Sequence, residues 1–325
     1  MTALVEPSLP LLVDLRQAKP DLLEPLLAEE VELWAANLDW DFRASAELIL
    51  RFIRMQSLSG YALLDGERAI GYCYYVQEDE KGLIGDVFVG RRDIGAGDHE
   101  VRLMAAALRA LAATPFVRRV EAQFMMLSRA ARARMPFPGL MKHFERLFMT
   151  AGIGRLRQLP AGPGAVRAEY YTWHEREMDA AARLMSAAYA RHVDSKINNQ
   201  YGSPAGARKF IANILEYPGC GSFFEAGSVV ALDIATGRLI GVCLASLVAF
   251  DVGHVTQVCV APEVRGSGIG YEMLRRSIAA MERHGCRAVS LTVTAANVDA
   301  VRMYERMGFA TRRVYEAFVW DGVGK

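Results

Sequence analysis

The sequence predicts an α/β chain made of two tandem copies of one unit, and three observations support this fold class. Residues 158-QLPAGPGAV-166 are rich in Pro, Gly and Ala and lie near the middle of the 325 residues. An offset of 171 residues aligns 88-FVGRRDIGAG-97 with 259-CVAPEVRGSG-268. Each half also repeats one order of elements. We therefore predict a first domain over residues 1–158, a linker over 159–166 and a second domain over 167–325.

The expected elements follow the same order in both halves. In the first half, a helix-rich segment over residues 21–56 precedes strand-like segments near 61–65, 70–76 and 83–89. In the second half, helices over 178–217 precede strands that begin near 222–227, 239–250 and 254–260. A helix and a further strand complete each half. β-branched residues in alternation favour the strands, and apolar residues at steps of three and four favour the helices.

Bulk properties exclude several classes of protein. The 38 basic and 37 acidic residues leave a formal charge of +1, which is not the basic footprint of nucleic-acid binding. Five scattered cysteines without a CxxC pair disfavour a disulfide framework and a zinc site, so no metal is expected. The apolar run 242–250 is about half as long as a membrane helix, and Pro7 and Pro10 interrupt the N-terminal run. We expect a cytoplasmic protein without a membrane or nucleic-acid partner.

The segment 257-QVCVAPEVRGSGIGYEMLRRS-277 is typical of a strand, a glycine-rich turn and a helix. Pro262 ends the strand because it cannot donate to a sheet ladder, and apolar residues then recur on one helical face until Gly285. The glycines of the turn therefore precede a helix N-terminus, where unpaired N–H groups and the helix dipole attract an anion. Glycine also allows the backbone to approach a ligand closely.

The spacing of these glycines excludes two common nucleotide motifs. Gly266, Gly268 and Gly270 form GxGxG, whereas a dinucleotide site needs GxGxxG and a P-loop ends in GK[ST]. Position 271 is Tyr271. A glycine-rich turn without any ligand is the alternative structural interpretation.

The pattern V-x-V-x-P-x-x-R-G-x-G-x-G resembles the GNAT superfamily of acyl-CoA-dependent N-acetyltransferases. A later block, 291-LTVTAANVDAVRMYERMGF-309, is similar to the family's motif N-x-x-A-x-x-x-Y-x-x-x-G-F. The resemblance implies two GNAT-like domains, each with a mixed, mostly antiparallel sheet flanked by helices. It also implies acetyl-CoA as co-substrate and transfer of its acetyl group to a primary amine by direct attack in a ternary complex. The N-terminal half shares only topology and the partial repeat.

The resemblance assigns coenzyme contacts to the strand, the turn and the later motif. The strand Val258, Cys259 and Val260 would hold the acyl carbonyl and the pantetheine amides through the backbone. The pyrophosphate would bind the turn, whose positions are Arg265, Gly266, Ser267, Gly268, Ile269 and Gly270. Asn297 would either touch the pantetheine arm or cap the following helix.

Direct transfer requires a base for the ammonium proton and an acid for the leaving thiolate. Tyr304 matches the family's acid position, and a phenol of pKa about 10 stabilises a thiolate chiefly by hydrogen bonding. His254 occupies the slot where many members carry a glutamate base, and an imidazole of pKa near 6.5 suits that role. Asp251, Glu263 and a water chain are alternatives.

The polar stretch 192-HVDSKINNQYGSPAGARKF-210 is expected to line the pocket for a small-molecule amine through Asp194, Asn198, Asn199 and Tyr201. It also has the composition of an ordinary connection between helices. In the first half, Ile94, His99 and Ala133 fall where Arg265, Gly270 and Tyr304 stand in the second. We therefore expect a degenerate, non-catalytic first domain.

Several alternatives remain open. The layout of a worn first unit and an intact second one also resembles the mycothiol synthases, which acetylate an amine of a cysteinyl pseudodisaccharide. A non-enzymatic acyl-CoA-binding sensor and a protein lysine acetyltransferase are the other functions considered. The sequence leaves open whether the chain forms a homodimer.

Overall fold

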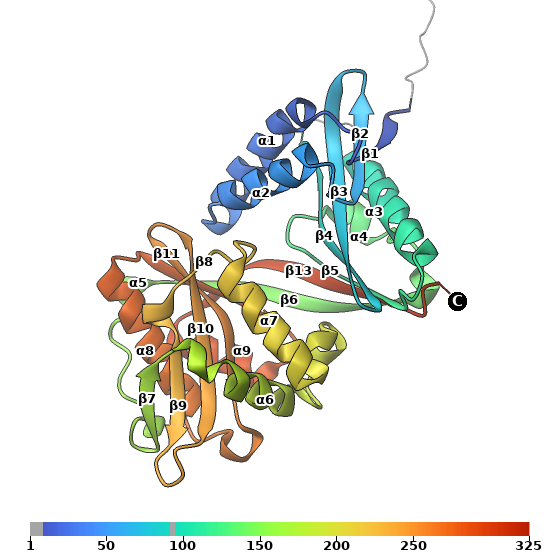
Figure 1. Ribbon diagram of the computed structural model, residues 1–325. Coiled ribbons are helices and arrows are strands. Elements are labelled where there is room, and N and C mark those ends of the chain that lie inside the picture. The colour runs from blue at the N-terminus through green and yellow to red at the C-terminus, as the bar shows by residue number, and fades with distance from the viewer. Residues whose placement is uncertain (1–8, 92–94, 325) are drawn as a thin grey trace, which may run out of the picture. The chain divides into compact units, whose positions relative to one another are not determined.

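A computed structural model describes residues 9–91 and 95–324 (Figure 1). Pro7 and Ile94 lie outside the described residues. Two compact units divide the chain: the first contains the described residues up to Trp34, Phe42–His143 and those from Tyr315 onward, and the second contains Ala35–Asp41 and Phe144–Val314. Each unit contains a mixed sheet with helices on both faces (Figure 1). The predicted α/β class is confirmed.

The first unit has its strands in the order β1, β2, β3, β4, β5 and β13, and the only parallel pair among these described strands is β4–β5. Its strands are β1 (Leu11–Asp14), β2 (Gly60–Asp65), β3 (Arg68–Glu78), β4 (Lys81–Val89), β5 (Arg119–Phe124) and the end of β13 (Ala310–Asp321). Its helices are α1 (Pro20–Leu38), α2 (Arg43–Arg54), α3 (Ala96–Ala113) and α4 (Arg129–Arg132). Alternate residues supply two cores, since Tyr72 packs with α1 and α2 whereas Cys73 packs with α3.

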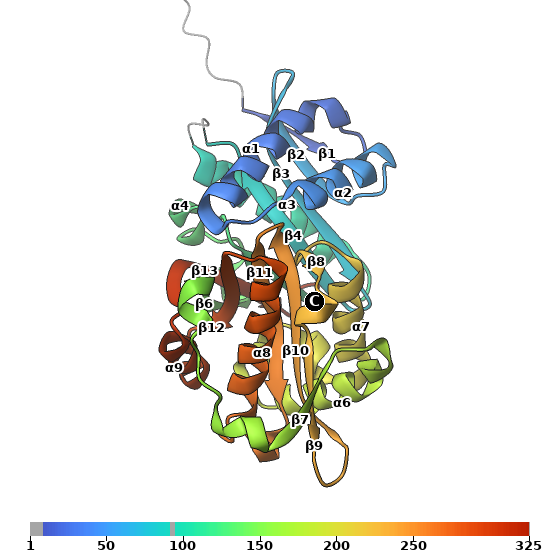
Figure 2. The same cartoon turned by 90° about the vertical axis from the view of Figure 1, so that its left-hand side faces the viewer.

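The second unit has its strands in the order β6, β12, β11, β10, β9 and β7, with β8 also paired to β10. Its strands are β6 (Met141–Gly152), β7 (Ala168–Thr172), β8 (Ser222–Phe223), β9 (Val229–Asp233), β10 (Leu239–Ala249), β11 (Val252–Val260) and β12 (Ala288–Thr294). Its helices are α5 (Ile153–Leu156), α6 (Met178–Tyr189), α7 (Pro204–Glu216), α8 (Ile269–His284) and α9 (Val298–Met307). Helices α6 and α7 cover one face of the sheet and α8 covers the other (Figure 2).

Each unit contains a strand from the other half of the sequence. β6 belongs to the first half of the chain, yet Arg146–Gly152 pairs with β12 of the second unit. β13 ends the chain, yet Glu316–Asp321 pairs with β5 of the first unit. The compact units therefore do not follow a single division of the chain at residues 159–166, because strand pairing joins segments that are distant in sequence.

Most expected elements are present, with one correction. The helix-rich segments and the strands near 61–65, 70–76, 83–89, 239–250 and 254–260 are confirmed within a few residues. The strand expected over 222–227 is wrong beyond Phe223, because a 3-10 turn over Glu225–Gly227 interrupts it and β9 starts at Val229. Among the described residues, no helix is both long and apolar enough to cross a membrane.

Candidate active site

An opening between two central strands is the main feature of the second unit. β11 and β12 pair in parallel only from Val252 and Ala288 to Val255 and Leu291, although β11 continues to Val260 and β12 to Thr294. At the same point Thr256 is an extra residue in the ladder between β10 and β11. Such a bulge bends a strand and ends regular pairing. The facing edges therefore offer unpaired backbone N–H and C=O groups to a ligand.

The predicted coenzyme positions on β11 differ in their environment. Val258 and Val260 are half-buried, whereas the Cys259 side chain is 8% exposed and belongs to the core. Burial raises the pKa of the Cys259 thiol to about 12, so this thiol is not a nucleophile at neutral pH. Any ligand contact of Cys259 therefore goes through its backbone, as the sequence predicts.

The glycine-rich turn forms the predicted junction between strand and helix. Gly266 and Gly268 have φ values of 75° and 87°, and Gly268 is the N-cap of α8. The first intrahelical bond runs from the Glu272 N–H to the Gly268 carbonyl at 3.0 Å, so the earlier N–H groups lack helical acceptors. A β-carbon added at Gly266 would meet no atom within 4 Å, and one at Gly270 would meet only Val260 Cγ1 at 3.8 Å. The turn is therefore open on this side.

The side chains of Arg265 and Ser267 stabilise the turn itself. The Arg265 guanidinium donates to the Ala188 carbonyl near the end of α6, and the Ser267 hydroxyl donates to the Val264 carbonyl at 2.5 Å. Both contacts hold the loop in shape and engage the two side chains within the protein.

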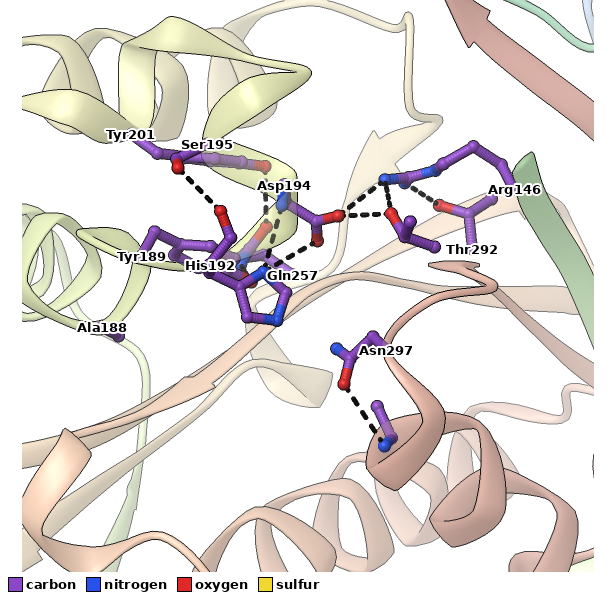
Figure 3. Close-up of polar contacts among 12 residues, drawn as sticks. Arg146, Ala188, Tyr189, His192, Asp194, Ser195, Tyr201, Gln257, Thr292 and Asn297 are labelled. Carbon is purple, nitrogen blue, oxygen red and sulfur yellow. Dashed lines mark hydrogen bonds and ion pairs between the residues drawn. The ribbon is translucent and has the colours of Figure 1, made fainter. Parts of the chain in front are cut away.

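A polar cluster joins β6, β12 and the connection after α6 (Figure 3). Arg146 Nη1 lies 3.3 Å from Asp194 Oδ1 and 3.0 Å from Thr294 Oγ1, and Nη2 lies 3.2 Å from Thr292 Oγ1. The Thr294 hydroxyl donates to Asp194. The side chains of Arg146 and Asp194 are 12% and 17% exposed, so this ion pair is shielded from most solvent and retains strength.

His192 adds a titratable group to this cluster (Figure 3). Its Nδ1 lies 3.2 Å from the Asp194 backbone nitrogen and 3.7 Å from Asp194 Oδ2. Nδ1 therefore accepts from the Asp194 amide, so the neutral ring carries its proton on Nε2, and the 3.7 Å to Oδ2 is too long for a hydrogen bond. Burial lowers the pKa of His192 below its ordinary 6.5, despite the opposing effect of Asp194. The imidazole is neutral at pH 7.

Tyr304 lies on α9 and is 5% exposed. Burial raises the pKa of Tyr304 well above its ordinary value, with smaller contributions from Cys243, Asp194 and Arg146. No described residue accepts a hydrogen bond from its hydroxyl, which is available to a ligand. Asn297 caps α9, since its Oδ1 accepts from the Ala300 N–H at 3.4 Å (Figure 3).

His254 occupies a different environment from the one expected of a base. Its side chain is 4% exposed, its Nδ1 lies 2.8 Å from Ser290 Oγ, and its ring lies 5.0 Å from Trp40 and 6.3 Å from Phe148. Burial lowers the pKa of His254 to about 3. An enclosed, neutral imidazole contributes to packing, and this geometry argues against the catalytic role predicted from the sequence. The alternatives Asp251 and Glu263 form ion pairs with Arg287 and Arg238.

The polar stretch after α6 divides into three roles. Asp194 joins the polar cluster, whereas Asn198 caps a 3-10 turn by accepting from the Gln200 N–H at 3.0 Å. Asn199 starts that turn and is exposed. The Tyr201 hydroxyl donates to Gln257 Oε1 at 3.3 Å, and Gln257 donates to the Tyr189 hydroxyl at 2.5 Å, so this buried set ties β11 to the helical face.

Sequence reasoning missed His192 and Arg146. His192 opens the polar stretch that the sequence singles out, so its position next to Asp194 was a usable signal. Arg146 lies in 141-MKHFERLFMTAG-152, where it follows Lys142, His143 and Glu145 and so does not stand out from its polar neighbours. Nothing local indicates that this strand pairs with β12, which lies some 140 residues later.

Comparisons with known proteins agree with this geometry. The family model described as Acetyltransferase (GNAT) family matches residues 193–309. The mycothiol acetyltransferase of Pseudarthrobacter chlorophenolicus is 36% identical over 92 residues, which are 27% of this chain and 28% of that protein. Matches to three further curated relatives span only 30%, 36% and 55% of those proteins. The chain therefore aligns with only part of each of these four relatives.

Two solved structures resemble the whole chain in fold. A GCN5-related N-acetyltransferase from Sphaerobacter thermophilus has a TM-score of 0.65 at 18% identity and covers 95% of both chains. A tandem GNAT protein from the clavulanic acid biosynthesis pathway has a TM-score of 0.59 at 13% identity and covers 96% of this chain and 98% of its own. These likenesses confirm the predicted tandem fold.

Proposed function

We propose, from the match of residues 193–309 to the GNAT acetyltransferase family model, that the second unit transfers an acetyl group from acetyl-CoA to a primary amine of a small molecule. One observation carries the proposal: the unpaired edge of β11 over residues 256–260 leads directly into the open glycine turn over 265–270. The strand edge would offer backbone hydrogen bonds to the extended arm of a ligand, and the turn would bind an anionic group at the end of that arm.

The described residues fit the coenzyme. Acetyl-CoA supplies an acetyl group activated as a thioester. The N–H groups around Gly266–Gly270 would hold its diphosphate, because both Gly266 and Gly270 leave free space beside the backbone. The unpaired backbone of Val258 and Val260 would hold the amides of the pantetheine arm.

The polar cluster supplies the groups that move protons. We assign the base to His192, because its partly exposed ring is neutral at pH 7. To take the proton of the amine at Nε2, the ring must exchange its amide contact for the tautomer with the proton on Nδ1, which faces Asp194 Oδ2 at 3.7 Å. Arg146 holds the Asp194 carboxylate in place. The Tyr304 hydroxyl donates a hydrogen bond to the departing sulfur, and its raised pKa keeps that proton on the phenol until then.

The first unit retains the architecture, but among its described residues the position that corresponds to Gly270 is blocked. Its β4–β5 pairing also ends early, and Gly95 is the left-handed N-cap of α3 as Gly268 is of α8. The offset of 171 residues pairs Gly95 with Gly266 and His99 with Gly270. When the starts of α3 and α8 are matched instead, Gly95 corresponds to Gly268, and Gly97 rather than His99 corresponds to Gly270. A β-carbon at Gly97 would lie 2.8 Å from Ala130 Cβ, so α4 already fills this space. We propose that this unit does not bind coenzyme.

Release of free thiol from acetyl-CoA with a panel of small amines tests the proposal. The full chain is required, because β6 and the linker belong to the second unit. The proposal is supported if wild type releases thiol with a small amine, Tyr304→Phe does not, and the control Tyr217→Phe, whose ring is exposed, still does. Coenzyme binding without turnover would instead indicate a sensor, and turnover only with lysine peptides would indicate a protein acetyltransferase.

A further inference from the structure

The linker between the predicted domains lies directly against the start of the helix that follows the glycine turn. Its 3-10 turn Pro163–Val166 and the residues before it pack on the first turn of α8. These residues lie outside 193–309, the range matched by the family model. The sequence indicated only a connection here.

The closest approach is between two glycines. A β-carbon added at Gly164 would lie 2.4 Å from the Gly268 carbonyl carbon and oxygen and 2.7 Å from the Ile269 nitrogen. One added at Gly268 would lie 2.9 Å from the Gly164 nitrogen and from Pro163 Cγ. Contacts below 3.0 Å to backbone atoms require the backbone to move. Both positions therefore require glycine, independently of the positive φ at Gly268.

Side chains fix the linker on both sides of this contact. Before it, the Tyr271 hydroxyl donates to the Pro160 carbonyl at 2.8 Å, and a β-carbon at Gly162 would lie 2.6 Å from the Tyr271 ring. After it, the Tyr170 hydroxyl donates to the Gly164 carbonyl at 2.7 Å. The Arg276 guanidinium lies 4.4 Å from the centre of the Tyr170 ring, an attractive cation–π arrangement.

A buried carboxylate completes the attachment. Glu272 is fully buried on α8, and both Arg275 and Arg276 bind it, at 2.7 and 2.8 Å. Burial disfavours its charge, but these arginines hold the pKa of Glu272 below its ordinary value, so it is ionised at pH 7. Its Oε2 lies 3.5 Å from the Gly162 nitrogen. The linker thus contacts the start of α8 at three points: Pro160 at Tyr271, Gly162 at Glu272, and Gly164 at Gly268 and Ile269.

We propose that the linker is a positioning element of the coenzyme turn and that Gly164 is its positioning residue, an inference that rests on the proposed function. The linker contacts Gly268 and Ile269 on one side, while Gly266 and Gly270 remain open on the other. Backbone N–H groups bind an anion well only when their directions are fixed beforehand. The linker supplies that fixation from outside the segment of strand, turn and helix that the family model matches.

The test compares Gly164→Ala with Gly154→Ala in the full chain. Gly154 lies in α5 near the linker, and a β-carbon there would meet no atom within 4 Å. Calorimetry with coenzyme A and with ADP measures affinity, and thermal unfolding reports folding. We expect Gly164→Ala to lower the affinity for both ligands by about tenfold, which corresponds to the loss of one hydrogen bond to a charged group. KM for acetyl-CoA should rise while kcat stays within about threefold.

Each outcome decides a separate point. If wild type binds no coenzyme A, the proposed function fails. If wild type binds it and folded Gly164→Ala binds equally well, only the positioning role is refuted. Where Gly164→Ala fails to fold, Tyr271→Phe decides instead, since it removes only the bond to Pro160. Tyr271→Phe should lower the affinity for coenzyme A by a smaller factor of about three, and unchanged affinity would refute the inference.

Discussion

Tyr304→Phe isolates the chemistry of one hydroxyl. The substitution keeps the ring, which is 5% exposed and packs edge-on against Phe309 at 6.1 Å between centroids. No other described residue accepts a hydrogen bond from the hydroxyl. Its removal should therefore change the free energy of unfolding by less than about 1 kcal/mol, because no internal bond is lost.

The expected effect on turnover is much larger. General acid groups contribute about 10²- to 10⁴-fold to a rate. Burial raises the pKa of Tyr304 above its ordinary value, so complete transfer of its proton to a thiolate is uphill and the lower end of this range applies. We expect kcat to fall about 10²-fold, or about 2.7 kcal/mol in activation free energy.

Thiol release measured at saturating acetyl-CoA gives kcat, and chemical denaturation gives stability. Tyr217→Phe, an exposed tyrosine of the same unit, serves as the control and should match wild type in both. A folded Tyr304→Phe protein that retains kcat within about threefold would refute the assignment. A loss of stability above about 2 kcal/mol would show that the hydroxyl has a structural partner.

Three further predictions concern titration. Burial lowers the pKa of His192, so kcat/KM should fall below an apparent pKa that lies under 6.5, and His192→Gln should lose that limb. Burial also lowers the pKa of His254 to about 3; the unfolded chain then binds a proton that the folded chain lacks, and stability should fall below pH 6.5 by up to about 1.4 kcal/mol per pH unit. The free energy of unfolding of His254→Gln should lack that pH dependence, and its kcat should be nearly that of wild type. A large loss of kcat would instead indicate that His254 is the base. In the first unit, burial and then Asp86 raise the pKa of Glu30, so the folded chain keeps a proton and stability should fall as pH rises above 4.5. The free energy of unfolding of Glu30→Gln, measured with urea, should fall with pH less steeply than that of wild type, by about 1.4 kcal/mol per pH unit. The same pH dependence in both proteins would contradict this.

The places of the proposed coenzyme turn and of Tyr304 in the fold follow from local sequence. Strand alternation, Pro262 and the glycine spacing determine where β11 ends and α8 starts, because backbone sterics and helix capping act over a few residues. The same holds for α9, which Asn297 caps and Gly308 ends with a φ of 104°. The elements that carry the proposed anion site and the proposed acid were therefore predictable without knowledge of the distant chain.

The surroundings of the candidate bases, the contacts of Arg146 and the linker contact depend on tertiary structure. His254 is enclosed by Trp40 and Phe148, which are distant in sequence, so its burial and lowered pKa leave no trace in its own neighbourhood. Arg146 reaches Asp194 only because β6 pairs with β12, and strand pairing between segments so far apart is not encoded in periodicity. Gly164 gains its role only where another backbone comes within van der Waals distance, and that approach is decided by packing.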